Sequence, residues 1–571
     1  MDAELRERIE AEAERHALMN ALLHEGSADV GAVMGPLMAE NPAFREHGDA
    51  IAGVVAPVVA EVNTLDADTM RDRLTSIDPA AVAELETTDD TPDHSLPPLP
   101  NIEEYEQVRM RLAPNPNAPY HLGHARMPAV IGTYKERYDG WMLCRFDDTD
   151  PETKRPDLAA YDQILEDVAF LGFEPDEVLI ASDRLELYYD HARTVIDAGG
   201  AYTCSCPAGE FSALKAAGEA CPHRDTPIDT VNKEFEEMVE GVVSSGERVL
   251  RIRSELGHDN PAVRDWVAFR MVDTPHPRDE AKSYRCWPLL DFQSAIDDHL
   301  TAVTHIIRGI DLQDSAKRQR YVYDYLDWTY PEVVHWGRVK VDEYDVPLSA
   351  SSIRELIEAG SLAGWDDPRA PTIASLRRRG IRGEAITAAM VELGTSTSSA
   401  ELSMSWIYSN NRDLIDTEAP RVFLVREGRP FDLEGATSPA KVPVHPDHDD
   451  RGVRRLDPRD GVLLEPADVP ALGESVWLKG LGCVVRGEDD ILSLTDDGIE
   501  VVRDGSVDVI HWVPQGDTRP VELRRPTGTV TGLAEAGLSS HGTDTMVQFE
   551  RIGFARIDEQ TEQTVAYFAH R

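Results

Sequence analysis

The stretch RLAPNPNAPYHLGH, from Arg111 to His124, constrains the fold of this chain more than any other feature. It follows a short β-prone run and leads into a helical pattern, and the next strand-like run ends in RFDDTDP, which begins at Arg145. A strand, a loop rich in glycine and proline, a helix and a second strand open a parallel α/β sheet. Ligands bind outside the carboxyl ends of the strands in such sheets. The sequence therefore predicts a doubly wound domain with a site in this loop.

The remaining patterns divide the 571 residues among several domains. Apolar residues have helical spacing at the start of the chain, and the later α/β alternation is interrupted by a segment that contains cysteines. Short β runs between turns, typical of a barrel, begin at about residue 420. We expect a helical N-terminal domain (1–86), a linker (87–100), a first α/β half (101–203), an insertion (204–285), a second α/β half (286–347), a helical connector (348–418) and a β-barrel (419–571).

The charge is strongly acidic along the whole chain. There are 104 acidic and 57 basic residues, a formal net charge of -47, and only nine of the basic residues are lysine. So diffuse an excess indicates adaptation to a salty cytoplasm, where screening shortens electrostatic interactions to a few Å. At high salt the acidic surface does not exclude RNA binding, which then depends on local arginine clusters, shape and base contacts.

The sequence gives no sign of a membrane protein. No run of 18 apolar residues occurs, and the charged, helix-like start lacks the apolar core of a signal peptide. We therefore expect a cytoplasmic protein without a membrane partner.

The HLGH turn has the residues that binding of a phosphate requires. Gly123 lets a nucleotide approach the backbone, and a helix start offers unpaired N–H groups to phosphate. His121 and His124 lie three residues apart, on one side of the first turn, where both can donate hydrogen bonds to an α-phosphate. The alternative is two histidines that cap an ordinary loop.

These stretches resemble the HIGH signature and a second sequence block of class I aminoacyl-tRNA synthetases. RLAPNPNAPYHLGH and RFDDTDP are similar to the glutamyl and glutaminyl branch, and the likeness to the archaeal and eukaryotic glutamyl type extends through much of 101–350. The resemblance implies a Rossmann-type catalytic domain, an insertion that contacts the tRNA acceptor end and a barrel that reads the anticodon. It implies an ATP site formed by Pro114, Asn115, Pro116, His121, Gly123, His124 and Ser349.

The same resemblance implies the residues that bind the amino acid. Arg111 is expected on a substrate carboxylate, Asp147 near the α-ammonium, and Asp291 in the block that lines the pocket. Glutamyl members have an arginine at the position of Arg308, and glutaminyl members have an uncharged residue there. A guanidinium facing the γ-carboxylate favours glutamate, because glutamine would leave a buried charge poorly paired, at a cost of about 1.5–3 kcal/mol. Arg111 and Asp147 could instead each belong to an ordinary ion pair at the surface or at a strand end.

The run VPLSASSIR, from Val346 to Arg354, occupies the place of the mobile KMSKS-type loop and contains no lysine. Ser351 and Ser352 are expected to act in catalysis, because serine hydroxyls and helix-start N–H groups bind phosphate. Arg354 or Lys340 would supply the positive charge. The alternative is a plain N-capping run before a helix.

Four side chains have the spacing of a metal site. Cys204, Cys206, Cys221 and His223 form a CxC and a CxH pair, and three of the six cysteines of the chain fall in this segment. Three thiolates and one imidazole suit tetrahedral zinc, here with a structural role in the insertion. The alternative is four unrelated loop residues.

Together these features predict an enzyme that uses ATP and Mg²⁺ to attach L-glutamate to tRNA(Glu) through a glutamyl-adenylate. Family habit implies a monomer, and the N-terminal domain is a candidate contact for a protein partner. The alternatives are an enzyme that also glutamylates tRNA(Gln), a glutamine-specific ligase, a small-molecule nucleotidyltransferase with an HxGH turn, and a non-catalytic tRNA-binding descendant. The roughly 220 residues beyond position 350 oppose the nucleotidyltransferase.

Overall fold

The computed structural model describes residues 3–23, 28, 30–31, 33–34, 37, 48–78 and 96–571. The chain forms two compact units, Met1–His94 and Ser95–Arg571. Most of the predicted linker, residues 87–100, lies outside the described residues, which resume at Leu96. No described helix is both long enough and apolar enough to cross a bilayer.

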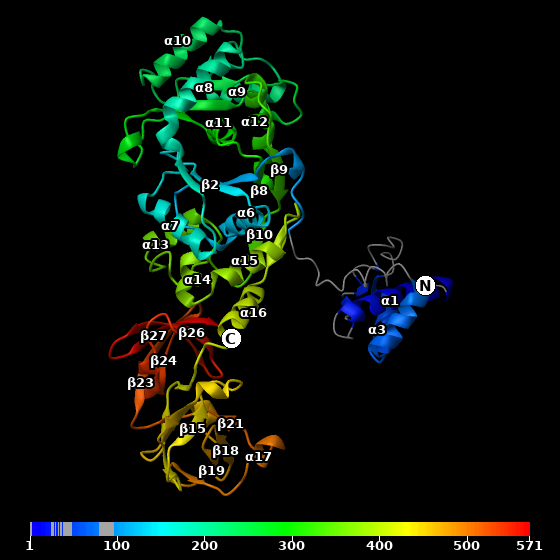
Figure 1. Cartoon of the computed structure of the whole chain (residues 1–571), viewed down its shortest axis with the longest axis vertical. Helices are drawn as coiled ribbons and strands as arrows, with labels where there is room; N and C mark the ends of the chain where they lie inside the picture. Colours follow the sequence, from blue (N-terminus) through cyan, green and yellow to red (C-terminus); the bar gives the residue numbers. More distant parts are fainter. Residues whose placement is uncertain are drawn as a thin grey trace. The chain divides into compact units, whose positions relative to one another are not determined.

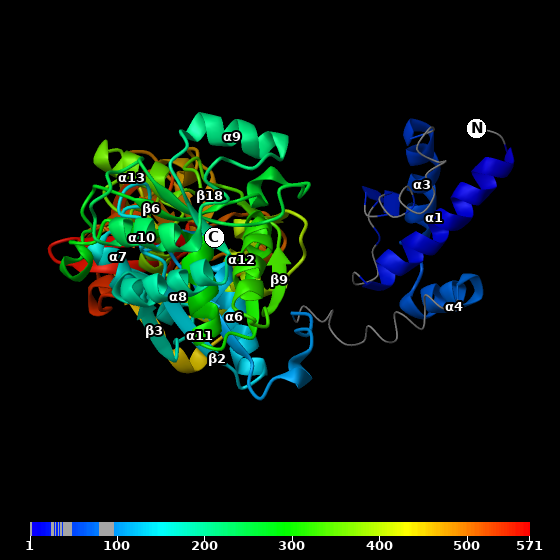
Figure 2. The same cartoon turned by 90° about the horizontal axis from the view of Figure 1, so that it is seen from above.

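The described part of the N-terminal unit is helical. Its helices are α1 (Ala3–Leu23), α3 (Gly48–Val62) and α4 (Ala67–Ile77), and α1 contacts both of the others (Figure 1, Figure 2). Small and branched apolar side chains on α1 and α3 are fully buried between them. The Asp66 carboxylate caps α4 by accepting a hydrogen bond from the Thr69 N–H group.

The unit Ser95–Arg571 begins with short parallel strands. Strands β1, β2 and β3 pair in parallel in that order, and β8 pairs in parallel with β9. The Thr304 N–H group, just before β8, donates to the Arg109 carbonyl, so β8 lies beside β1. From β1 the chain adds β2 and β3 on one side of the sheet and later adds β8 and β9 on the other. Such sheets bind ligands where the strand order reverses, here between β1 and β8. The bounds are β1 (Arg109–Leu112), β2 (Trp141–Phe146), β3 (Glu177–Ile180), β8 (His305–Gly309) and β9 (Glu332–Trp336).

Helices alternate with these strands, as the sequence predicts, and the inner strands β1, β2 and β8 are mostly buried. Five of the six residues of β2 are buried, because a parallel strand is covered on both faces. Met110, Leu112 and Met142 share one core with apolar residues of the helix that follows the HLGH turn. The helices are α6 (Arg126–Arg137), α7 (Leu158–Phe170), α8 (Leu185–Asp197), α11 (Leu290–Leu300) and α12 (Gln313–Tyr325).

The insertion is an antiparallel sheet with strand order β4-β5-β6-β7. Its first strand begins at Ala201 and its last ends at Pro288, so the sheet extends beyond the predicted 204–285 at both ends. All four residues of β4 are buried, which makes this strand part of the core of the insertion. The elements are β4 (Ala201–Cys204), α9 (Ala208–Ala217), α10 (Ile228–Val239), β5 (Val249–Ile252), β6 (Val267–Met271) and β7 (Cys286–Pro288).

The connector is mainly helical and joins the α/β sheet to the C-terminal sheets. Its Arg379 is 1% exposed and donates to the carbonyls of Phe568 and Ala569, close to the end of the chain. This buried side chain therefore ties the connector to the last strand. The elements are β10 (Val339–Val341), α13 (Ala350–Glu358), α14 (Ile373–Arg379), α15 (Gly383–Glu392), β11 (Ala400–Leu402) and α16 (Met404–Ile415).

The C-terminal region contains two seven-stranded sheets, ordered β12-β25-β26-β27-β23-β24-β13 and β21-β18-β19-β20-β14-β17-β22 (Figure 1). The chain leaves the first sheet after β13, builds the second and returns, so no continuous segment forms the first. The bounds are β12 (Arg421–Val422), β13 (Leu424–Val425), β14 (Arg429–Glu434), β15 (Ala440–Pro443), β16 (Val453–Leu456), β17 (Val462–Leu464), β18 (Ser475–Leu478), β19 (Gly482–Arg486), β20 (Ile491–Leu494), α17 (Glu500–Arg503), β21 (Val509–Ile510), β22 (Val513–Pro514), β23 (Thr518–Arg525), β24 (Gly528–Glu535), β25 (Met546–Phe549), β26 (Gly553–Gln560) and β27 (Thr564–His570).

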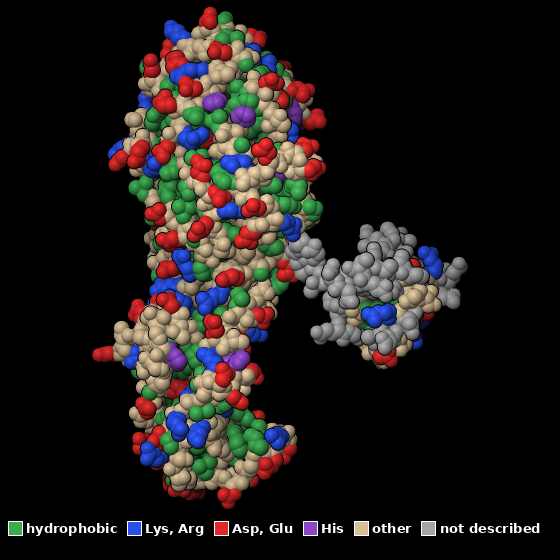
Figure 3. Space-filling view, in the orientation of Figure 1, with side chains coloured by type: hydrophobic (Ala, Val, Ile, Leu, Met, Phe, Trp, Pro, Cys, Tyr) green, Lys and Arg blue, Asp and Glu red, His purple; other side chains and the backbone are tan. Residues whose placement is uncertain are grey.

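The acidic residues are spread over the surface. Figure 3 shows Asp and Glu side chains distributed over the visible face of the unit Ser95–Arg571, with Lys and Arg side chains between them. The surface therefore has the diffuse negative charge that the composition predicts.

Candidate active site

The histidine turn lies between β1 and α6 and consists of a short 3₁₀ turn, Leu122–His124. The imidazole rings of His121 and His124 stack, with centroids 3.6 Å apart and planes at 20°. A Cβ atom on Gly123 would lie 3.1 Å from the His121 ring, so glycine permits this close packing. Backbone hydrogen bonds with connector residues 371–373 hold the turn in place.

Both imidazoles favour the neutral form. Burial lowers the pKa of His121 to about 4. The pKa of His124, whose side chain is exposed at one edge, is lowered as well, by desolvation and by the neighbouring His121 and Lys154. A neutral imidazole has one N–H donor and one acceptor nitrogen. The Nδ1 atom of His121 is buried and has no hydrogen-bond partner within the described chain. The pair can therefore offer N–H groups to a phosphate.

The loop before the turn is tied to the block that follows β2. Asn115 donates through Nδ2 to the Asp147 carbonyl at 2.8 Å, and the Asp147 N–H group donates to the Pro114 carbonyl at 2.9 Å. The Pro116 carbonyl accepts from the Asp157 N–H group at 2.8 Å. The Oδ1 atom of Asn115 is buried without a partner in the described structure. The predicted nucleotide loop is thus a rigid segment beside the two histidines.

A buried charge network joins the carboxyl end of β1 to β2 and α11. Arg111 donates through Nε and Nη2 to both carboxylate oxygens of Asp298, at 3.1 and 3.3 Å. Arg145 donates to Asp298 at 2.6 Å and to Asp147 Oδ1 at 2.7 Å. Gln293 also donates to Asp147 Oδ1, at 2.7 Å. Arg111 and Asp147 therefore lie together as predicted, but each already has a protein partner.

Arg308 is a buried arginine whose hydrogen bonds all go to neutral groups. It is 5% exposed, at the carboxyl end of β8, and donates through Nη2 to Gln319 Oε1 and to the Tyr330 hydroxyl, both at 3.2 Å. Its Nε atom is buried without a partner, and within residues 96–571 no carboxylate forms an ion pair with it. Burial lowers its pKa, and the nearby Arg111 acts in the same direction.

Asp291, predicted to bind the substrate, forms an ion pair with Arg318 of α12. Its Oδ1 atom is buried and has no partner among the described residues. One oxygen is thus taken by the protein and the other is open to a donor.

The serine-rich run begins α13. Ser349 is the N-cap of this helix, accepts from the Ser352 N–H group, and its hydroxyl lies 3.0 Å from that of Ser351. The capping alternative is therefore correct for Ser349, and it does not exclude a second role. Arg354, one turn later, donates to the Asn117 carbonyl, so it reaches the nucleotide loop.

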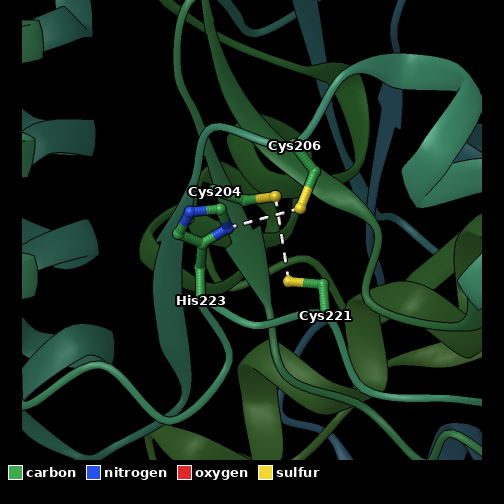
Figure 4. Close-up of side chains that lie close together, drawn as sticks. All are labelled: Cys204, Cys206, Cys221 and His223. Atoms are coloured by element: carbon green, nitrogen blue, oxygen red, sulfur yellow. Dashed lines mark hydrogen bonds between the residues drawn. The ribbon is translucent and has the colours of Figure 1, made fainter.

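The Cys and His residues of the insertion come together as the sequence predicts (Figure 4). Sγ of Cys204 lies 3.9 Å from Sγ of Cys221, and Sγ of Cys206 lies 3.3 Å from Nδ1 of His223. All four ligand atoms lie within 4.8 Å of one another. Metal–sulfur bonds of about 2.3 Å in a tetrahedron place the ligand atoms about 3.7 Å apart, so the arrangement fits zinc.

Several buried polar atoms around the histidine turn and the charge network have no partner in the described structure. An unpaired buried polar atom costs about 1–3 kcal/mol, so such a group of atoms indicates a site for a polar ligand. These atoms are Asn115 Oδ1, Tyr120 Oη, His121 Nδ1, Gln293 Oε1 and Arg308 Nε.

Comparison with known proteins identifies the family. The catalytic-domain model of class I tRNA synthetases (E and Q) matches residues 107–416, and two anticodon-binding-domain models of the same group match 419–501 and 509–558. The chain is 60% identical to the glutamate–tRNA ligase of Haloarcula marismortui and 61% identical to that of Natronomonas pharaonis, in each case over 100% of both chains. The glutamate–tRNA ligase of Pyrococcus furiosus is 42% identical over 99% of this chain and 100% of its own.

The chain belongs to the class I tRNA synthetases for glutamate and glutamine. These full-length relatives place the synthetase in the family of glutamate–tRNA ligases. The predicted fold is confirmed: a class I catalytic domain is followed by anticodon-binding β domains. Relatives from halophilic archaea agree with the salt adaptation that the charge of the synthetase predicts.

Sequence reasoning missed three buried residues of this synthetase that hold the predicted ones in place. Arg145 and Asp298 form the charge network, and Gln319 contacts Arg308. The signal for Asp298 is the adjacent pair of aspartates in helix α11, where Asp297 and Asp298 are both buried. Charged residues inside a buried helix are nearly always paired, so this pair predicts nearby arginines.

Proposed function

We propose that this synthetase activates L-glutamate with ATP and attaches it to the 3′ end of tRNA(Glu). The observation that supports this most directly is Arg308, a buried guanidinium that contacts only neutral groups. A buried charge without a counter-ion is costly, and the γ-carboxylate of glutamate would supply that counter-ion. Glutamine would present an amide to the same guanidinium and leave the charge unneutralised.

The reaction has two steps. An oxygen of the glutamate α-carboxylate attacks the α-phosphorus of ATP, the bond to pyrophosphate breaks, and glutamyl-adenylate forms. A hydroxyl of the terminal tRNA ribose then attacks the glutamyl carbonyl carbon, loses its proton, and AMP leaves. Correct placement and stabilisation of phosphate charge are sufficient for both steps, so no covalent protein intermediate is needed.

The nucleotide would bind against the histidine turn. His121 and His124 would donate hydrogen bonds to the α-phosphate, whose charge increases in the transition state, and Gly123 would let it approach the backbone. Asn115, between Pro114 and Pro116, has a buried oxygen available for a donor of the nucleotide. Mg²⁺ would balance phosphate charge when bound.

The lysine-free loop would contribute through Ser349, Ser351 and Ser352, with Arg354 as the cation. Arg354 already reaches the nucleotide loop at Asn117. A guanidinium there can take the place of the absent lysine on the departing pyrophosphate.

The insertion would hold one structural zinc ion. Its ligands would be Cys204, Cys206, Cys221 and His223, a closed set without room for a substrate. The metal would fix the loops between β4 and α10.

The amino acid would lie with its α-ammonium near Asp147 and Asp291, beside Arg111.

The test is pyrophosphate exchange into ATP in concentrated KCl, with glutamate or glutamine, and with tRNA(Glu), tRNA(Gln) or no tRNA. We expect exchange with glutamate in the presence of tRNA(Glu), and none with glutamine. His124→Ala should abolish exchange without unfolding the protein, and Arg308→Cys should weaken the preference for glutamate. Normal exchange by His124→Ala would remove the role of that histidine. An unchanged preference in Arg308→Cys would mean that another group reads the γ-carboxylate.

A further inference from the structure

Gln319 connects Arg308 to the rest of the buried core. It lies on α12 and is 1% exposed. Its Oε1 atom accepts from Arg308 Nη2 at 3.2 Å and from the Tyr330 hydroxyl at 2.6 Å, and its Nε2 atom donates to Ser294 Oγ at 2.5 Å. The Ser294 hydroxyl in turn donates to the Leu290 carbonyl at 2.6 Å. The side-chain amide is therefore held at both ends.

These contacts fix which end of the amide faces Arg308. A guanidinium has only donors, so it requires the oxygen of the amide. Ser294 donates its own proton to a carbonyl, so its oxygen is available to accept from the amide nitrogen. Every group in the chain Arg308–Gln319–Ser294 thus has its donor facing an acceptor, and the orientation of the amide is determined by its neighbours.

The acceptor beside Arg308 is neutral, which distinguishes this arginine from its neighbours. Arg111 and Arg145 are held by the carboxylates of Asp298 and Asp147. A carboxylate at position 319 would hold Arg308 in the same geometry and would neutralise it. The Gln319 amide instead positions one edge of the Arg308 guanidinium and leaves its positive charge available to a substrate carboxylate.

We propose that Gln319 is a positioning and specificity-determining residue, which orients Arg308 while keeping its charge uncompensated, so that the synthetase prefers glutamate over glutamine. This inference rests on the proposed function, in which Arg308 binds the γ-carboxylate. In this proposal the preference for glutamate depends on the neutral side chain of residue 319 as much as on its hydrogen bonds.

Gln319→Glu tests the charge and leaves the shape nearly unchanged. The new carboxylate would pair with Arg308, so the KM for glutamate in pyrophosphate exchange should rise at least about ten-fold. The KM for ATP should stay within about two-fold, and the ratio of kcat/KM for glutamate to that for glutamine should fall at least about ten-fold. A role in folding alone would not change this ratio.

The matched control is Gln107→Glu. Gln107 is exposed and accepts a hydrogen bond from Arg109, so the same substitution beside an arginine occurs in water, where it should change neither KM nor the ratio. Gln319→Met removes the hydrogen bonds without adding a charge. It should raise the KM for glutamate less than Gln319→Glu does, and it provides a second test if the glutamate variant does not fold.

The outcomes separate this inference from the proposed function. If Arg308→Cys retains the full preference for glutamate, the role that the proposed function gives to Arg308 fails, and another group reads the γ-carboxylate. If Arg308→Cys loses the preference while Gln319→Glu and Gln319→Met both keep the wild-type KM and ratio, Arg308 is the reader and Gln319 does not position it. An equal effect of Gln319→Met and Gln319→Glu would overturn the argument from charge.

Discussion

Replacing Asp298 by asparagine removes a carboxylate that contacts both Arg111 and Arg145. Its side chain is 1% exposed, and the side chains of Arg111 and Arg145 are 5% and 0% exposed. An asparagine has one oxygen for these donors, and its NH₂ group would face a guanidinium. Two buried positive charges would then lack a neutralising partner on this side, with Arg308 also nearby.

The expected cost is large because the removed charge is buried. Breaking a buried ion pair by removing one partner costs about 3–5 kcal/mol. In a domain of this size 1 kcal/mol corresponds to roughly 2 °C in Tm, so the transition should fall by about 6–10 °C. The surrounding acidic surface does not replace the lost carboxylate, because exposed charges are screened at high salt.

The assay is scanning calorimetry in concentrated KCl, following the transition that ATP and glutamate together raise, since ligands stabilise the domain that binds them. The matched control is Asp183→Asn, which removes a carboxylate that pairs with Arg278 and is 44% exposed. Such a pair is worth at most about 1 kcal/mol, a shift of roughly 2 °C. Equal shifts for the two variants would refute the view that the network around Asp298 stabilises the catalytic domain.

Three further predictions follow from the geometry. The folded protein holds the partly buried His121 neutral with a pKa of about 4, whereas the unfolded chain protonates it below about 6.5. Stability should therefore be constant above pH 6.5 and fall as the pH drops toward 4; chemical unfolding of His121→Asn should show a flatter decline, and an identical pH profile would contradict the burial argument. Purified protein should contain one zinc per chain by elemental analysis, Cys206→Ser should lose it and the control Cys483→Ser should keep it; retention by Cys206→Ser would exclude this ligand. A Cβ at Gly383 would lie 1.7 Å from the Phe170 carbonyl, so Gly383→Ala should lower Tm by several degrees. The control Gly209→Ala has open space around it in α9, so its Tm should be unchanged or slightly higher. An unchanged Tm for both variants would show that the α7–α15 contact is not tight.

The local patterns of the sequence predicted much of the fold. A strand at Arg111, a turn with two histidines and a helix after it are all present, because glycine, proline and helical spacing act over a few residues. The cysteine and histidine pairs could also be recognised, because the ligands of a structural metal site often stand only a few residues apart in the sequence. The C-terminal β region predicted as a barrel contains two seven-stranded sheets. Their strand order could not be predicted, because the pairing of β13 with β24 joins residues about 110 positions apart and leaves no local signal.

By itself, the sequence determined the family, the class of fold and the candidate residues. His121 and His124 could be named because residue type and local spacing carry their chemistry, and Arg308 because its stretch resembles that of the glutamyl family. Only the tertiary structure decided what each of them contacts: Arg111 pairs with Asp298, whereas Arg308 faces the neutral Gln319. The physical reason is that burial and pairing depend on strands and helices distant in the chain, and the same arginine is neutralised or left charged according to the group that packing brings beside it.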